Sequence, residues 1–207
     1  MPSKFVDFTE RFVLLNMGAA NTGRHDAALP SGWQQGDSVA FEALVRQWQQ
    51  PVARFLARLA AETDQVADLC QEVFLRVYLA RDRYQETGAF STWLYRIALN
   101  VARDAARRRR RQPASLADPE LAGAAESAGQ VSARREIADA VAAAIDALPQ
   151  PMREVLVLRH YEGMRFEEIA RLTRIPASTL KSRFAAALAR LRDTLHTLDD
   201  RPEEAQP

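Results

Sequence analysis

The chain has 207 residues, a net charge of +1, 47% hydrophobic and 27% charged residues. This is an ordinary composition for a folded globular protein of one domain or two small ones. The single cysteine, Cys70, excludes an internal disulfide and a metal cluster held by thiolates. No uninterrupted apolar run approaches membrane-spanning length, so we expect no membrane insertion and a cytoplasmic protein.

The first helix is predicted to begin at Asp37, whose carboxylate suits an N-cap. Its apolar face includes Leu44 and Trp48, which recur at helical spacing. Pro51 is expected to start a new turn, because proline lacks the N–H that a continuing helix needs.

A second helix is predicted from Val66 to Tyr78, with apolar residues at core-facing spacings of three and four. Its opposite surface carries four polar residues: Asp68, Gln71, Glu72 and Arg76. This surface is either a solvated face or a ridge that docks on a basic partner protein. The pattern alone favours the solvated face.

The stretch from Phe90 to Arg111 predicts a helix with two different faces, with Ser91 as its N-cap. Apolar residues form one face: Leu94, Ile97, Ala98, Val101 and Ala105. An aromatic, an amide and a line of cations lie beside it: Trp93, Arg96, Asn100, Arg103, Arg107 and Arg110. Guanidinium groups and an indole suit phosphates and stacking bases. The final arginine run alone fits a solvated helix end equally well.

The loop that leads into this helix, residues 83–89, carries Tyr84, Gln85 and Glu86. It is expected to lie beside Trp93. A loop next to aromatic and cationic side chains is a suitable seat for unstacked bases.

Residues 112–132 have a different composition, with three acids, no cation, two prolines and two glycines. We interpret them as a flexible acidic linker. The fold class is therefore predicted as all-α, with two small helical domains over 36–111 and 133–198. Residues 1–35 form an unassigned extension, and residues 199–207 form an acidic tail.

The second domain is predicted to contain a helix-turn-helix between Phe166 and Arg190. Pro151 suits the first turn of the helix before it, and Gly163 suits that helix's end. A short helix, a turn over 173–176 and a second helix then follow. N-terminal residues of the second helix would reach base edges in a major groove. These residues are Ser178, Thr179, Lys181, Ser182 and Arg183.

Three segments together resemble the extracytoplasmic-function (ECF) sigma factors of bacterial RNA polymerase. Residues 68–74 resemble the family's polymerase-binding helix, and residues 90–100 resemble its promoter-melting helix. Residues 148–183 resemble its fourth region. The resemblance covers about residues 36–195, in the right order with a linker of the expected kind.

The resemblance implies a sigma factor that binds core polymerase, recognises two promoter elements and promotes melting, with no enzymatic activity and no cofactor or metal. Three residues would bind the polymerase: Asp68, Gln71 and Glu72. Eight would bind the minus-ten element: Tyr84, Gln85, Glu86, Trp93, Arg96, Asn100, Arg103 and Arg107. The minus-thirty-five element would be bound by Ser178, Thr179, Lys181, Ser182 and Arg183. Core RNA polymerase and promoter DNA, duplex and opened, are the expected partners, and an anti-sigma factor is expected with them.

Three positions depart from the family pattern. Arg165 stands where Ser or Thr commonly caps the short helix. Ala186 and Leu188 stand where many members carry arginines, so fewer phosphate contacts are expected there.

Two other functions compete with this interpretation. A helix-turn-helix regulator would bind duplex DNA without polymerase and would need neither Trp93 nor Asn100. An enzyme is weakly supported, because the three histidines are scattered and no phosphate-binding glycine loop follows a strand.

Overall fold

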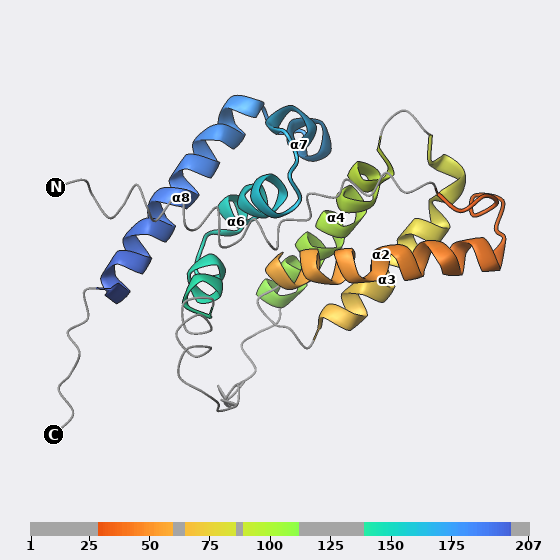
Figure 1. Ribbon diagram of the computed structural model, residues 1–207, viewed down its shortest axis with the longest axis horizontal. Coiled ribbons are helices and arrows are strands. Elements are labelled where there is room, and N and C mark those ends of the chain that lie inside the picture. Colours follow the sequence, from red (N-terminus) through yellow and green to blue (C-terminus); the bar gives the residue numbers. More distant parts are fainter. Residues whose placement is uncertain (1–28, 60–64, 86–88, 112–138, 200–207) are drawn as a thin grey trace, which may run out of the picture.

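The computed structural model describes residues 29–59, 65–85, 89–111 and 139–199, and within these ranges it contains helices and no strand (Figure 1). The predicted linker, the residues before 29 and the end of the tail lie outside these ranges. The N-terminal part contains α2 (Ser38–Leu59), α3 (Val66–Leu79), the short 3₁₀ helix η1 (Arg81–Arg83) and α4 (Phe90–Arg111). No described helix is both long and apolar enough to span a bilayer.

The C-terminal part begins with a helical segment over 139–146. It continues with α6 (Gln150–Leu156), the π-helical turn η2 (Val157–Tyr161), α7 (Phe166–Thr173) and α8 (Ala177–Asp199). Pro151 lies in the first turn of α6, as expected. Gly163 has a φ of +66° at the end of the following turn, a conformation that glycine adopts without a Cβ clash. The all-α fold is confirmed.

The N-cap of α2 is the one predicted from the sequence. The Asp37 carboxylate accepts hydrogen bonds from the backbone N–H groups of Val39 and Ala40, at 2.8 and 3.2 Å. The expectation for Pro51 is wrong, because α2 runs through it without a new start. Pro51 is buried beside Trp48 and Val52, and burial of this apolar face offsets the one backbone hydrogen bond that proline cannot make.

Residues 31–36 form a turn that packs on the N-terminal helices, so the packed unit starts before residue 36. Trp33 is only 3% exposed and contacts the rings of Tyr84 and Phe90, with centroids 5.5 and 5.6 Å apart. The Gln34 side chain donates to the backbone oxygens of Arg81 and Tyr84, at 3.3 and 2.9 Å. This turn therefore fixes the loop that precedes α4.

The helix α4 is packed along most of its length. Its buried residues include Leu94, Ala98, Leu99 and Val101, and it packs against both α2 and α3. The expected N-cap at Ser91 is wrong: α4 already begins at Phe90, two residues before the start that a Ser91 cap would give. The Phe90 ring is buried in the aromatic cluster.

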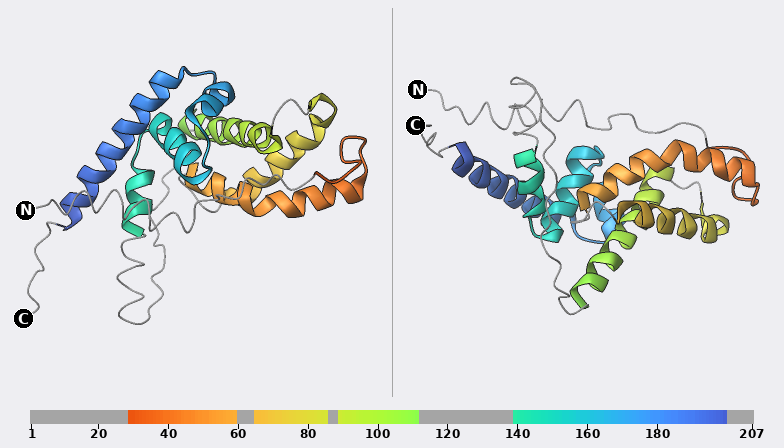
Figure 2. Two further views of the ribbon diagram at one scale, coloured as in Figure 1. Left: turned by 45° about the horizontal axis from the view of Figure 1, so that its top comes forward. Right: turned by 90° about the horizontal axis from the view of Figure 1, so that it is seen from below.

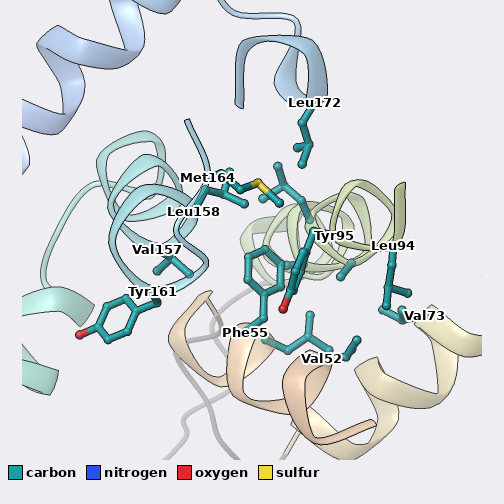
Figure 3. Packing of buried hydrophobic residues seen from close by; sticks show 14 of the residues in the cluster. Val52, Phe55, Val73, Leu94, Tyr95, Val157, Leu158, Tyr161, Met164 and Leu172 are labelled. Atoms are coloured by element: carbon teal, nitrogen blue, oxygen red, sulfur yellow. The ribbon is translucent and has the colours of Figure 1, made fainter. Parts of the chain in front are cut away.

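The two parts of the protein share one continuous hydrophobic core. Phe55 of α2 and Tyr95 of α4 lie with ring centroids 4.8 Å apart, and Leu158 and Met164 of the C-terminal part gather beside them (Figure 3). Figure 2 shows the C-terminal helices on one side of the α2–α4 bundle, with α7 packed on α4. The two helical parts are therefore docked on each other in this structure.

Replacement of Trp33 tests whether residues 31–36 belong to the folded core. Trp33→Ala is expected to lower the free energy of unfolding by about 3–5 kcal/mol, because it removes a fully buried indole. Trp33→Phe, the matched control, should lose clearly less. Urea denaturation followed by circular dichroism measures both, and a Trp33→Ala loss under about 1 kcal/mol contradicts the assignment.

Candidate nucleic-acid interface

The exposed side of α4 carries the polar stripe that the sequence indicates. Arg96, Asn100 and Arg107 are all exposed and lie along one helix face, with Asn100 one turn after Arg96 and Arg107 two turns after Asn100. The arginines of residues 108–111 are exposed as well and extend the cationic surface to the end of the helix. Donors spaced from Arg96 to Arg111 along this helix, at a rise of 1.5 Å per residue, can follow the phosphates of a nucleic-acid strand.

Trp93 lies at the start of this stripe but is half-buried. Its ring packs against Tyr84 and Phe90, with centroids 5.0 and 5.6 Å away. Tyr84 is itself buried, so it packs against the inner side of Trp93 and does not face solvent. Gln85 is exposed, whereas Glu86 lies outside the described residues. At this end of the stripe, a base could therefore stack only on the accessible edge of the aromatic cluster, at Trp93.

Arg103 belongs to the same stripe, yet its guanidinium group is already engaged. Its Nε and Nη2 atoms donate to the two carboxylate oxygens of Glu154 in α6, at 2.9 and 2.6 Å. These hydrogen bonds raise the pKa of Arg103 above its usual value. Glu154 is buried and also accepts from the side chain of Gln150 at 3.2 Å. Sequence reasoning could not find this pair, because its members lie 51 residues apart.

A chain of ion pairs connects the outer surface of α3 with the stripe on α4. Arg76 donates to Glu72 at 2.7 Å and to Asp104 at 2.9 Å, and Arg107 donates to the other oxygen of Asp104. The bond from Arg76 is the main cause of a lowered pKa at Asp104. Asp68 and Glu72 are like charges one turn apart on α3, and the pairing of Arg76 with Glu72 offsets their repulsion.

The polar ridge predicted on α3 lies on the surface. Asp68 and Gln71 are exposed, and Glu72 is half-exposed. The ridge continues into two residues that the sequence analysis missed, Leu75 and Leu79, which are 54% and 67% exposed. Their positions continue the spacing of three and four residues from the acidic end, and this continuation was the available signal. A polar patch followed by exposed leucines is typical of a partner-binding surface.

Tyr78, expected in the core, lies at its edge and is 36% exposed. Its ring contacts Phe41 at 5.1 Å, and the Arg81 guanidinium lies 4.2 Å from the ring centroid. The last residues of α3, Tyr78 and Leu79, thus point outward. The buried side of this part of the helix consists of Val73, Phe74 and Val77.

The C-terminal part contains the helix-turn-helix geometry. The Thr173 hydroxyl donates to the Ile169 carbonyl at 2.7 Å, and the N–H of Arg174 donates to the Ala170 carbonyl at 2.8 Å. Arg174 has a φ of +59°, which ends α7 sharply. The space between the helices is filled by Ile169, Leu172, Leu180, Ala187 and Leu191, all buried, with Ile175, Phe184 and Leu188 packed against them.

The predicted base-reading positions stand at the N-terminal end of α8. Ser178, Lys181 and Ser182 are exposed, while Thr179 and Arg183 are half-buried. The Ser182 hydroxyl donates to the Ser178 carbonyl at 3.1 Å. This end therefore presents one ammonium, one guanidinium and three hydroxyl groups to the outside, a mixed set of donors and acceptors that suits base edges and phosphates.

Comparisons with known proteins agree with both halves of this description. The Sigma-70 region 2 family matches residues 44–112, and the Sigma-70 region 4 family matches residues 138–191. The chain is 35% identical over 172 residues to the ECF RNA polymerase sigma-E factor of Escherichia coli K12, covering 78% of this chain and 90% of the relative. It is 32% identical over 176 residues to the RNA polymerase sigma-H factor of Pseudomonas aeruginosa, covering 80% and 91%.

Solved structures show the same fold. CnrH, in complex with the cytosolic domain of CnrY, is matched with a TM-score of 0.61 and 26% identity over 82% of this chain and 96% of that one. The sigma factor RpoE of Bartonella quintana, in complex with the anti-sigma factor NepR, is matched with a TM-score of 0.62 and 21% identity over 78% and 98%. The fold and the two helical surfaces define a DNA-binding initiation factor. The chain belongs to the ECF sigma factors of RNA polymerase.

The unusual cap of α7 can be tested directly. The backbone N–H of Arg165 donates to the Glu168 carboxylate at 2.7 Å, which is one half of a capping box. Arg165→Thr is expected to supply the other half and raise the free energy of unfolding by about 0.5–1 kcal/mol. Arg165→Ala removes the same charge without a cap and is the control. Chemical denaturation compares them, and equal stabilities contradict the assignment.

Proposed function

We propose that this sigma factor binds core RNA polymerase through the outer surface of α3. The surface comprises Asp68, Gln71, Glu72, Leu75 and Leu79. Its acidic end suits a basic surface on the polymerase, and its leucines supply apolar area that folding leaves in water. Electrostatic attraction would guide the encounter, and burial of the leucines would hold the complex.

The single observation that carries the proposed role in melting is the polar stripe of α4. Arg96 and Asn100 stand exposed next to Trp93, with Arg107 two turns further on. Phosphates of an opened strand would bind the cations, and a base would stack on the accessible edge of Trp93. We propose that Gln85 and Glu86 of the preceding loop complete the minus-ten site, and that the buried Tyr84 supports the Trp93 ring. Melting would follow from preferential binding to the opened strand, with no bond chemistry by this protein.

We propose that α8 reads the minus-thirty-five element with its first turns. Ser178, Thr179, Lys181, Ser182 and Arg183 occupy the part of the helix that enters a major groove in helix-turn-helix proteins. Lys181 and Arg183 would also supply phosphate contacts. The absence of an arginine at Ala186 limits the number of phosphate contacts and hence the salt dependence of this half of the site. Leu188, the other departure from the family pattern, packs against the core.

An anti-sigma factor is the expected inhibitor. The solved structure of CnrH contains the cytosolic domain of CnrY, and we propose that this chain is held by a comparable protein on the exposed surface of α3. The protein would act in the cytoplasm, with its polymerase and promoters. The rival function, a duplex-binding regulator independent of polymerase, is not favoured, because residues 44–112 match region 2 of the sigma factors.

A transcription assay tests the promoter-specificity role. The protein is combined with bacterial core polymerase on a library of random upstream sequences, and transcribed templates are sequenced. Two separated motifs are expected to be enriched over core polymerase alone. Arg96→Ala with Asn100→Ala should erase the downstream motif, and Lys181→Ala with Arg183→Ala should weaken the upstream one.

One outcome of the same assay would contradict the proposal. If no sequence is enriched over core polymerase alone, the proposed function is wrong. Gln49→Ala serves as a control, because Gln49 is an exposed residue of α2 outside both DNA surfaces, and it should leave both motifs unchanged.

A second prediction concerns the polymerase surface. Leu75→Glu is expected to lower the affinity for core polymerase on the order of tenfold or more, because it places a charge in the centre of an apolar contact. Thermal unfolding should hardly change, since the Leu75 side chain is 54% exposed. Gln49→Glu adds the same charge on α2 and is the control. Affinity is measured by fluorescence anisotropy with labelled protein, and equal values for both variants would exclude Leu75 from the interface.

A further inference from the structure

Arg103 lies in the middle of the α4 stripe, between Asn100 and Arg107, yet it faces the protein's own C-terminal part. Its guanidinium makes a two-point contact with the buried carboxylate of Glu154. This geometry is the one in which arginine binds a phosphate group. The carboxylate therefore occupies a position where the opened strand would place an anion.

Other contacts hold the two parts in the same arrangement. The Arg58 guanidinium of α2 lies 4.1 Å from the ring centroid of Tyr161. Arg153, next to Glu154, donates to the backbone oxygen of Leu59 at 3.4 Å. Phe55, Tyr95 and Tyr161 belong to the same shared core (Figure 3). The closed arrangement is thus a packed interface with a polar rim, and it includes a residue proposed to bind DNA.

In the closed arrangement, the α4 stripe and the first turn of α8 lie too close together to contact both promoter elements at once. The helix α7 packs on α4, is eight residues long, and is followed by α8 after a turn over 174–176. The first turn of α8 therefore lies within about 30 Å of the α4 stripe, given a helix rise of 1.5 Å per residue and a diameter near 10–12 Å. Elements centred about 25 base pairs apart are separated by about 85 Å along straight duplex, at 3.4 Å per base pair.

We propose that the free protein is autoinhibited by this closure, with Glu154 competing with DNA for Arg103. The inference rests on the proposed function of the α4 stripe and adds its regulation. DNA binding requires the two parts to separate, so the apparent affinity of the free protein is reduced by the small fraction of open molecules. Loss of Glu154 removes the competing anion and increases that fraction.

The test uses the full-length protein in the absence of polymerase. Cys70 is replaced by alanine, and cysteines are introduced at Gln49 and Ala185, both exposed, to carry a donor and an acceptor dye. Glu154→Gln and Glu154→Arg are expected to lower the energy transfer between the dyes. The charge-swapped protein, Arg103→Glu with Glu154→Arg, should restore the transfer, because the pair is rebuilt in reverse.

Binding of a fluorescein-labelled single-stranded DNA of mixed sequence is measured in parallel. Glu154→Gln is expected to raise the affinity about tenfold. The charge-swapped protein should bind no better than the parent, since it is closed and lacks Arg103. The control, Glu42→Gln, removes an exposed carboxylate that is paired with Arg46 on α2 alone, and it should change neither energy transfer nor affinity. Circular dichroism confirms that each variant is folded.

The outcomes separate this inference from the proposed function. If Glu154→Gln leaves energy transfer or DNA affinity at the parental value, autoinhibition through this pair is wrong, even when the holoenzyme transcribes from the enriched promoters. The same conclusion follows if the charge-swapped protein stays open. If the holoenzyme enriches no promoter sequence, the proposed function fails independently of how the free protein closes.

Discussion

The burial of α4 is the constraint on which the rest of the structure depends. The helix contacts α2 and α3 through Leu94, Ala98 and Val101, and it contacts α7 of the C-terminal part. A helix that is fixed on several sides can present only its remaining side to a ligand, and here that side carries Arg96 and Asn100. The entropy cost of ordering this helix is incurred during folding, so a nucleic-acid strand would bind to side chains that are already in place.

Charge placement follows from the same packing. Six arginines lie between residues 103 and 111, and their mutual repulsion would weaken an isolated helix. Acidic partners reduce this repulsion: Asp104 accepts hydrogen bonds from Arg76 and Arg107, and Glu154 accepts them from Arg103. The arginines of residues 108–111 remain exposed at the helix end, where the dipole favours positive charge. The cationic surface is therefore graded, with paired cations near the core and exposed ones at the tip.

Much of the helical organisation could be predicted from the sequence, because it depends on the spacing of residues that are close together in the chain. The two faces of residues 90–111, the Asp37 cap and the helix-turn-helix all follow from spacings within one or two turns. The missed features depend on contacts between distant segments. Trp33 is buried by Tyr84 and Phe90, Pro51 is tolerated because its helix is packed, and Arg103 meets a carboxylate 51 residues away. Leu75 and Leu79 were missed because exposure, unlike periodicity, is decided by what the neighbouring helices leave uncovered.

The closed arrangement treats the two proposed binding surfaces unequally. Asp68, Gln71 and Leu75 on α3 stay exposed when the parts are docked, whereas the Arg103 side chain on α4 is paired with Glu154 of α6 and only 26% exposed. Glu154 and Arg103 belong to one chain, so Glu154 has a high effective concentration near Arg103, and under the proposed autoinhibition DNA alone would compete poorly with it. Among the described residues none covers these exposed side chains of α3, so polymerase would meet no such competitor there. If it binds the open form more tightly, it shifts the population toward that form by its differential affinity. Under the proposed autoinhibition, polymerase would bind first and promoter DNA second, because the docked protein covers part of its DNA surface and leaves its polymerase surface exposed.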